Sequence, residues 1–552
     1  MPEAITGIGG YAASFSPSLL PRPWYFQGLV SGLSAMFGYQ VGLLLSWTAS
    51  AVAERLGVEV RLKPGLRFGG MTAGAAVLAV GTVAIPLWSL RWHRNTANHV
   101  QRPGPGALWA TGSAGVAAGV FWLLLGQWKA TLWAIKFVTD RLSSHRLAFG
   151  LLARLVSTLV VLATILVVLD QVILRGVVGV ATSASAQVDR RTPPNVFQPA
   201  TPLHSGSVES FEEWESLGLQ GKRFTCAGPS RERIIEVLGD DAGVHQPIRA
   251  YASMNGRSLP EVTAAVLAEL DRTDAWSRRA ILVVTTTGRG NVNEWSTSAF
   301  EFLMRGDCAT AAMQYSGLPS AVTMLSSKQQ PVEASRLLFG AIEERVNALP
   351  TDQRPKLYVA GESLGAFGSN GTFDSADDMV ARAAGGVWTG CPTFSPLHTE
   401  LTRARDAGST SVLPVVDGGR HVRFAMTPQQ LLTGPNGQPL GEWAEPRFVY
   451  LQNDTDPVVW WGTHLLWQRP AWLDETAGDG TPMGQMPWWP FITFWQIAVD
   501  MTACRSVGPG YGHKYHSAQC VPTWAAVLGL DPQADWSAVI EALDTDVPPV
   551  AP

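Results

Sequence analysis

The chain has 552 residues, a formal net charge of −4 and a pI of about 6.2. This length allows two or three domains, and the balanced charge excludes the basic field expected of a nucleic-acid-binding protein. Charged residues make up 16% of the chain, against about a quarter in typical soluble domains. The deficit falls mainly on the first 175 residues, which are rich in long apolar runs.

Four apolar runs of about twenty residues occupy this region, at 26–47, 68–87, 107–127 and 156–174. A helix of that length crosses the ~30 Å hydrocarbon core of a bilayer. The runs contain many Gly, Ala and Ser residues, which favour close helix packing in lipid. We therefore predict a four-helix transmembrane domain over residues 1–178; the alternative is a buried helical bundle of a soluble protein.

The basic residues of the short loops predict the orientation of these helices. Nine lie between the first and second or between the third and fourth runs: Arg55, Arg61, Lys63, Arg67, Lys129, Lys136, Arg141, Arg146 and Arg154. Five lie in the other flanking segments: Arg22, Arg91, Arg94, Arg102 and Arg175. This bias places the first and third loops in the cytoplasm. The part of the chain after the fourth run is then expected on the extracytoplasmic side.

The remainder of the chain reads as a linker followed by an α/β domain. Residues 179–222 are expected to form the linker, since their first half is rich in Ser, Thr and Pro. From 223 to 546 short apolar strands alternate with helical patterns, which predicts a mostly parallel sheet flanked by helices. Strands are predicted at 247–251, 280–285, 321–325, 357–360, 385–389 and 447–451, helices at 259–270, 332–348 and after Ser363, and a frayed tail at 547–552.

The clearest motif is Gly361-Glu362-Ser363-Leu364-Gly365, directly after the predicted strand 357–360. A Gly-x-Ser-x-Gly turn after a buried strand is the nucleophile elbow of an α/β-hydrolase, in which the glycines permit a sharp turn that exposes the serine hydroxyl. The pentapeptide alone is weak support because short patterns recur by chance. An acid and a base that follow it in the order Ser, Asp, His make the interpretation specific.

The predicted acid is Asp456, in the turn after strand 447–451, and the predicted base is His513, in the glycine-containing loop 510–516. Asp454 is the alternative acid, although turn capping would explain its presence. His516 is the alternative base, but it can also be read as the start of the last helix. A serine needs such a base to become nucleophilic, and the base needs an acid that orients it.

An oxyanion hole requires two backbone N–H donors, one of them from the residue after the nucleophile, Leu364. The second is expected from the loop after strand 280–285, where Gly288 and Arg289 are the candidates. That loop contains Gly-x-Gly but neither a P-loop nor a dinucleotide fingerprint, so we reject a nucleotide site. The ten histidines show no metal-binding spacing, and no metal or cofactor is predicted.

The positions of the cysteines and tryptophans each allow more than one structural interpretation. All five cysteines follow the last apolar run; Cys504 and Cys520 flank His513 and could form a disulfide in an oxidising compartment. The chain has 22 tryptophans, with clusters at 460–461, 467, 472, 488–489 and 495. These clusters could form an apolar wall or lid near the site or at the membrane interface. Ordinary packing is the alternative.

Several longer motifs lie along the chain, at 17–24 with Gln27-Gly28, Gly306-Asp307 with 314–320, Arg354-Pro355 with 361–366, 450–452 with Asp456-Pro457, 493–496, and 510–513 with Tyr515. Through these motifs the chain resembles the bacterial membrane-anchored α/β-hydrolase family that has its own N-terminal domain, formerly a domain of unknown function. The resemblance implies a multi-span domain joined to a hydrolase domain, with Ser363, Asp456 and His513 as the triad. Two departures are Thr287-Gly288-Arg289-Gly290-Asn291, where the family tends to have Thr-Gly-Thr-Gly-Trp, and Gly390-Cys391-Pro392, where it tends to have Gly-Pro-Pro.

These observations predict an integral membrane serine hydrolase that cleaves an ester of a lipid or an acylated envelope component. An acyltransferase that passes the acyl group to an alcohol would use the same residues, because only the exclusion of water differs. A non-catalytic membrane scaffold with a degenerate hydrolase fold is the alternative from another class.

Overall fold

The computed structural model describes residues 2–57, 64–106, 108–143, 150–168, 170, 175–176, 179, 189, 191–435 and 437–547. The chain forms two compact units. The helical unit comprises Met1–Val177 and Trp461–Val507, and the sheet unit comprises Val178–Trp460 and Gly508–Pro552. The boundaries expected at residues 178, 222 and 546 stay predictions; residues 548–552 of the expected tail lie outside the described residues.

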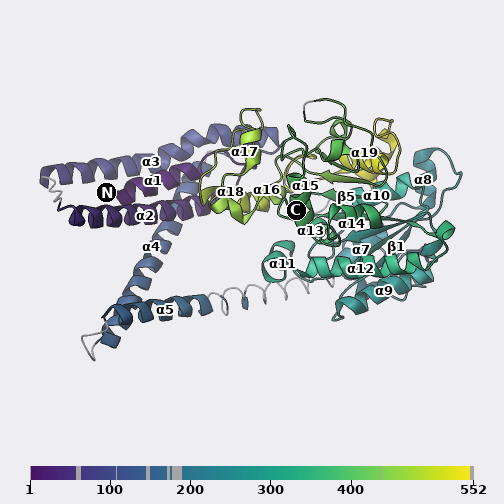
Figure 1. Cartoon of the computed structure of the whole chain (residues 1–552), viewed down its shortest axis with the longest axis horizontal. Coiled ribbons are helices and arrows are strands. Elements are labelled where there is room, and N and C mark those ends of the chain that lie inside the picture. The colour runs from purple at the N-terminus through teal and green to yellow at the C-terminus, as the bar shows by residue number, and fades with distance from the viewer. Residues whose placement is uncertain are drawn as a thin grey trace. The chain divides into compact units, whose positions relative to one another are not determined.

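In the described residues, the N-terminal part of the helical unit contains the helices α1 (Pro2–Ser14), α2 (Trp24–Arg55), α3 (Pro64–His99), α4 (Leu108–Ser143) and α5 (Gly150–Val168) (Figure 1). Two segments, Trp24–Arg55 and Leu108–Arg141, are long and apolar enough to cross a membrane. A shorter apolar helix covers Leu152–Val167. The side chains of residues 68–79 in the second predicted run, and residues 169 and 171–174 in the fourth, lie outside the described part of the chain.

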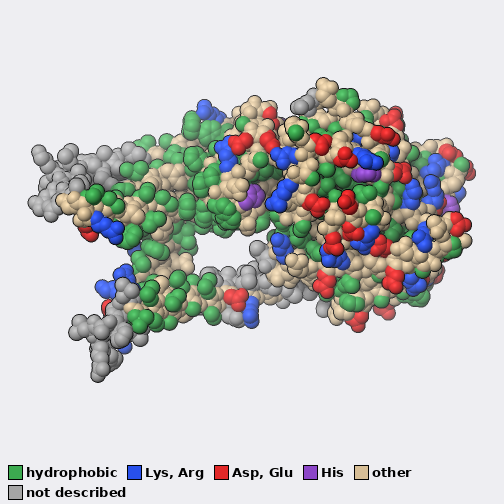
Figure 2. Space-filling model, viewed as in Figure 1, with side chains coloured by type: hydrophobic (Ala, Val, Ile, Leu, Met, Phe, Trp, Pro, Cys, Tyr) green, Lys and Arg blue, Asp and Glu red, His purple; other side chains and the backbone are tan. Residues whose placement is uncertain are grey.

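Helix α2 packs against α4 through glycines that leave no room for a side chain. A Cβ atom on Gly28 would lie 2.8 Å from the Ser113 carbonyl oxygen, and one on Gly32 would lie 2.8 Å from that of Ala117. Such small-residue contacts bring helix backbones together where apolar burial gives little driving force. The outer faces of these helices are apolar (Figure 2). Their exposed side chains include Leu44, Leu45, Trp47, Trp122, Leu123 and Trp133, and α5 exposes Leu159 and Leu166.

The second part of the helical unit, which we call the insertion (Trp461–Val507), joins the first although more than 280 residues separate them. It contains η7 (Thr463–Leu466), α17 (Ala471–Glu475), α18 (Ile492–Asp500) and η8 (Met501–Ala503). Nε of Arg22 lies 3.0 Å from Oδ1 of Asp500, and both side chains are fully buried. The rings of Phe37 and Phe491 stack at 4.4 Å.

The sheet unit contains seven parallel strands in the order β1-β3-β2-β4-β5-β7-β6. They are β1 (Ile248–Ala252), β2 (Ala280–Thr285), β3 (Cys308–Met313), β4 (Lys356–Glu362), β5 (Gly385–Thr389), β6 (Val422–Ala425) and β7 (Arg447–Leu451). The predicted parallel sheet is therefore confirmed. The strand predicted at 321–325 is wrong, since these residues belong to helix α11 (Ser320–Ser326).

Helices cover both faces of the sheet. The helices described in the sheet unit are α7 (Gly218–Ala227), α8 (Arg231–Leu238), α9 (Leu259–Arg272), α10 (Glu294–Leu303), α11, α12 (Gln330–Asn347), α13 (Leu364–Asn370), α14 (Ala376–Arg382), α15 (Pro396–Arg403), α16 (Pro457–Trp460), α19 (Ser517–Val527) and α20 (Ser537–Asp546). Short 3-10 turns lie at Trp214–Leu217, Ala275–Ser277, Thr351–Gln353, Asp417–Gly419 and Pro428–Leu431.

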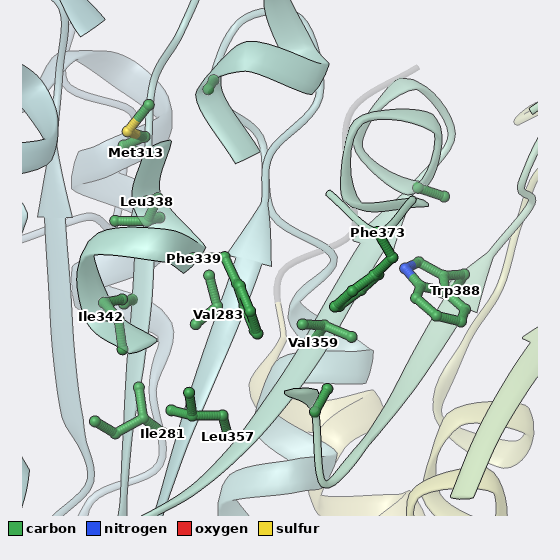
Figure 3. Close-up of a cluster of buried hydrophobic side chains, with 14 of the residues drawn as sticks. Ile281, Val283, Met313, Leu338, Phe339, Ile342, Leu357, Val359, Phe373 and Trp388 are labelled. Carbon is green, nitrogen blue, oxygen red and sulfur yellow. The ribbon is translucent and has the colours of Figure 1, made fainter. Parts of the chain in front are cut away.

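Two hydrophobic clusters, one on each face, hold these helices to the sheet. Alternate strand residues point to opposite faces, so Ile281 and Val283 join α9 and α12 on one side, with Trp388 and Phe373 (Figure 3). On the other face, Leu282 packs with residues of α10, α19 and α20. The central strands β2 and β4 are buried on both faces, which explains their nearly continuous apolar sequence.

Candidate active site

The Gly-x-Ser-x-Gly turn lies where β4 ends and α13 begins. Ser363 has φ 58° and ψ −121°, a strained conformation for a residue with a side chain. Its amide donates to the Thr389 carbonyl oxygen of β5 at 3.0 Å. Ser363 is half-buried, whereas the other four residues of the turn are buried. The turn therefore presents the serine side chain while its neighbours pack inward.

Both glycines of this turn are required by close backbone contacts. A Cβ atom on Gly361 would lie 2.6 Å from the carbonyl carbon of Gly365. One on Gly365 would lie 2.8 Å from the Thr286 carbonyl oxygen. The first turn of α13 therefore packs directly against the end of β2. The loop that follows β2, which carries the predicted oxyanion donors, begins beside Gly365, the residue after Leu364.

Asp456 and His513 are in direct contact. Oδ2 of Asp456 accepts a hydrogen bond from Nδ1 of His513 at 2.6 Å, and the two residues are 0% and 4% exposed. Asp456 follows β7 at the start of α16, and His513 lies in the loop before α19. Asp454, the alternative acid, is a partly buried residue of the same turn. His516, the alternative base, lies at the N-terminal end of α19.

Two further donors fix the Asp456 carboxylate. The Tyr515 hydroxyl donates to Oδ2 at 2.7 Å, and the Val458 amide donates to Oδ1 at 2.9 Å. The Tyr515 hydroxyl also accepts a hydrogen bond from the Asn453 amide at 3.1 Å. Burial, reinforced by the Asp456 charge, raises the pKa of Tyr515 well above its usual value. Tyr515 therefore stays protonated and remains a donor to the carboxylate.

The His513 ring rests on Gly390, at the end of β5. A Cβ atom on Gly390, whose φ is 59°, would lie 2.6 Å from Nδ1 of His513 and 2.9 Å from Oδ2 of Asp456. The Ser363 amide is bonded to Thr389, the residue before Gly390. These contacts bring the histidine ring to the nucleophile turn. Within the described residues, Nε2 of His513 has no hydrogen-bond partner, which leaves it available to an incoming proton.

The residue before the serine also faces this ring. Oε1 of Glu362 lies 3.7 Å from Nε2 of His513, and each side chain is 4% exposed. Oε2 of Glu362 accepts a hydrogen bond from Nδ2 of Asn293. Sequence reasoning assigned no role to Glu362, Tyr515 or Gly390, although each lies inside or beside a motif.

Cys391 follows Gly390, where the sequence departs from the family pattern. It is 1% exposed, and burial raises the pKa of its thiol to about 12. A thiol in this state is a poor nucleophile. No disulfide is formed among the described residues, so the bond that the sequence allows between Cys504 and Cys520 is absent from this part of the chain.

The loop after β2 is tightly folded around Gly288. The Thr287 amide donates to Asn291 O at 2.9 Å, and the Gly290 amide donates to Thr287 O at 2.8 Å. The Gly288 amide donates to the Ser320 hydroxyl at 3.2 Å. A Cβ atom on Gly288 would lie 2.6 Å from Leu318 O. The Arg289 amide has no acceptor recorded within the described residues.

The parallel sheet, the strained serine turn after a central strand and the Asp–His pair beyond it define an α/β-hydrolase. A family model described as "Alpha/beta-hydrolase family" matches residues 248–541, and one described as "Alpha/beta-hydrolase family N-terminus" matches residues 15–229. The chain therefore belongs to this α/β-hydrolase family, which confirms the resemblance found in the sequence. Searches of curated proteins and of solved structures gave no match. Among the described residues, no group of His, Cys, Asp or Glu could hold a metal ion.

Proposed function

We propose that this α/β-hydrolase is a membrane-anchored serine hydrolase that cleaves an ester bond through an acyl-enzyme. The observation that carries the proposal is the 2.6 Å contact between His513 and Asp456 beside the strained turn of Ser363. A buried acid that holds a histidine by Nδ1 leaves Nε2 as the basic nitrogen. A half-buried serine at a positive φ, presented by a tight turn, is the partner such a base requires.

In this mechanism Ser363 Oγ attacks the acyl carbonyl carbon while its proton passes to Nε2 of His513. The proton then moves to the leaving oxygen as the ester C–O bond breaks. Water repeats both steps to release the acid. Asp456 holds the ring in the required tautomer and stabilises the imidazolium.

The oxyanion is assigned to two backbone amides. Leu364 is the first residue of α13, so its N–H has no acceptor within the helix. In the loop after β2 the Gly288 amide is already bonded to Ser320. Arg289 is therefore the preferred second donor, and Gly288 serves the packing of the loop.

Two features support a membrane location and a lipid or acylated envelope component as substrate. Helices α2 and α4 are long and apolar enough to span a bilayer, and they carry large exposed hydrophobic side chains, among them Trp47 and Leu123. The basic residues of the loops support a multi-pass arrangement with the sheet unit on the extracytoplasmic side. Retention in the membrane pellet after an alkaline carbonate wash tests the anchoring.

Labelling of membranes with a fluorophosphonate probe tests the chemistry. Wild-type protein should be labelled, and Ser363→Ala should not. Ser326→Ala is the matched control, because it removes an exposed hydroxyl of α11 and should leave labelling unchanged. No labelling of folded wild-type protein, or equal labelling of Ser363→Ala, would refute the proposal.

A further inference from the structure

A second carboxylate faces the candidate base from the side opposite Asp456. Oε1 of Glu362 lies 3.7 Å from Nε2 of His513, while Oδ2 of Asp456 lies 2.6 Å from Nδ1. All three side chains are at most 4% exposed. The triad mechanism needs only the Asp456 carboxylate, so Glu362 is a buried charge for which that mechanism has no use.

We infer that Glu362 is a positioning residue that stabilises the protonated form of His513 through its Oε1 carboxylate oxygen. The inference rests on the proposed function, since it concerns the cation formed when Ser363 gives up its proton. Opposite charges within about 4–6 Å favour the charged form of a group. Burial strengthens that attraction, because solvent screens the pair less.

The separation suits this role better than a closer contact would. At 3.7 Å the carboxylate attracts the cation but lies beyond hydrogen-bond distance of Nε2. The Nε2–H bond formed during attack can therefore still point to the leaving oxygen. Glu362 thus stabilises the cation without accepting the proton that the leaving group must receive.

Asn293 holds the Glu362 carboxylate in this position. Its Nδ2 donates to Oε2 of Glu362, which leaves Oε1 facing the ring. Its Oδ1 accepts from the Ser296 amide at 3.1 Å and so caps helix α10. One side chain therefore ties the carboxylate to the N-terminus of a helix that packs against the sheet.

The charged and titratable groups around His513 define the expected pH effect. Asp456, Glu362 and the protonated Tyr515 hydroxyl face the ring or its acid. Burial raises the pKa of Tyr515 and of Cys520; for Tyr515 the Asp456 charge adds to this effect, and the Glu362 charge makes a smaller contribution in both cases. Tyr515 and Cys520 therefore stay neutral. Glu362 and Asp456 are left as the two negative charges that act on the ring.

The test compares the pH dependence of labelling by a fluorophosphonate probe in wild-type protein and Glu362→Gln. The glutamine keeps the shape of the side chain and removes its charge. The acid limb of the rate profile should move to lower pH by about one unit. The plateau rate should fall about tenfold, equivalent to about 1.4 kcal/mol of transition-state stabilisation.

Two further variants separate this role from a loss of stability. Asn293→Ser keeps an N-cap residue on α10 but removes the amide that holds Glu362; it should shift the limb in the same direction by a smaller amount. Glu269→Gln removes another buried carboxylate, one that contacts Ser205 and Arg272, and should leave the profile unchanged. A wild-type profile in Glu362→Gln, or an equal shift in Glu269→Gln, would overturn the inference alone. Absence of labelling in the wild-type protein would overturn the proposed function and this inference with it.

Discussion

His513 and His398, two of the buried histidines of the sheet unit, have contrasting surroundings. His513 lies between the carboxylates of Asp456 and Glu362. His398 is 1% exposed and faces the amide oxygen of Gln452 at 3.1 Å instead. Burial lowers the pKa of His398 to about 4, and the Gln452 contact opposes that effect. His398 is therefore a neutral packing residue, while His513 is placed among groups that favour its cation.

The lowered pKa of His398 predicts a loss of stability in acid. Between pH 6.5 and pH 4, this histidine is protonated in the unfolded chain but stays neutral in the folded chain. The free energy of unfolding therefore decreases as the pH falls through this window. The loss is about 1.4 kcal/mol per pH unit. His398→Gln should lose about 2 kcal/mol less than wild type between pH 6.5 and pH 5, measured by urea unfolding. An equal loss in both proteins would contradict this prediction.

For single residues, the sequence predicts which side chains form the candidate triad but not which other side chains contact them. Ser363, Asp456 and His513 could be selected because each lies beside a strand end or a glycine and their order matches the fold. The contact of Glu362 with His513 depends on which way the last residue of β4 points. That direction follows from the pairing of Glu362 with Thr389 of β5, a register that spacing does not reveal.

Among the secondary-structure elements, the most apolar strands are those that the sequence predicts correctly. Strand β3 (Cys308–Met313) was missed because half of its residues are alanine, and β6 (Val422–Ala425) because it is only four residues long and contains an arginine. The run 321–325 is apolar enough for a strand, but it follows Pro319, which precedes the first turn of α11. Proline is common at the start of a helix, so Pro319 at the N-cap favours a helix over a strand at this position.

Gly390, at the end of β5, contacts the His513 ring, and its replacement by alanine is predicted to reduce activity strongly. Gly390→Ala must tolerate a positive φ and place a Cβ against the His513 ring and Asp456 Oδ2. We expect a loss of at least about 100-fold in hydrolysis of 4-nitrophenyl butyrate, since misplacement of about 1 Å can cost that much. Gly408→Ala is the control: it has φ 86° but open space around its Cβ. It shares the backbone strain, so equal losses in both variants would assign the effect to strain alone.

For the molecule as a whole, the sequence predicts the apolar N-terminal helices. It does not predict that the insertion, residues 461–507, packs with them. The insertion lies between Asp456 and His513 in the chain, yet it packs with the N-terminal helices as one unit. Its tryptophans divide accordingly: Trp472 is 5% exposed and packs inside, while Trp467 is 66% exposed. The local sequence of the insertion does not indicate that it packs with the N-terminal helices, because this packing depends on contacts between residues about 480 apart in sequence.

One group of these long-range contacts is centred on Asp500. Its carboxylate pairs with Arg22 and accepts hydrogen bonds from the Ser18 hydroxyl and the Leu20 amide. Arg22 and Asp500 are fully buried, so removal of one partner leaves the other charge uncompensated. The contact joins two segments of the chain. Residues 17–24 are one of the motifs that carry the family resemblance, and Asp500 follows another, 493–496.

Asp500→Ala is therefore predicted to release the insertion from the N-terminal helices. Breaking a buried pair typically costs 3–5 kcal/mol, so the variant in detergent should melt at lower temperature and be cleaved faster within residues 461–507 by limited proteolysis. Asp474→Ala is the control from the same insertion. Asp474 pairs with Arg469, and the two side chains are 65% and 45% exposed, respectively. Such surface pairs contribute about 1 kcal/mol or less to the free energy of unfolding. Equal cleavage of the two variants would contradict the prediction. A double variant, Arg22→Met with Asp500→Leu, should recover much of the loss, because it removes both charges and leaves neither buried alone.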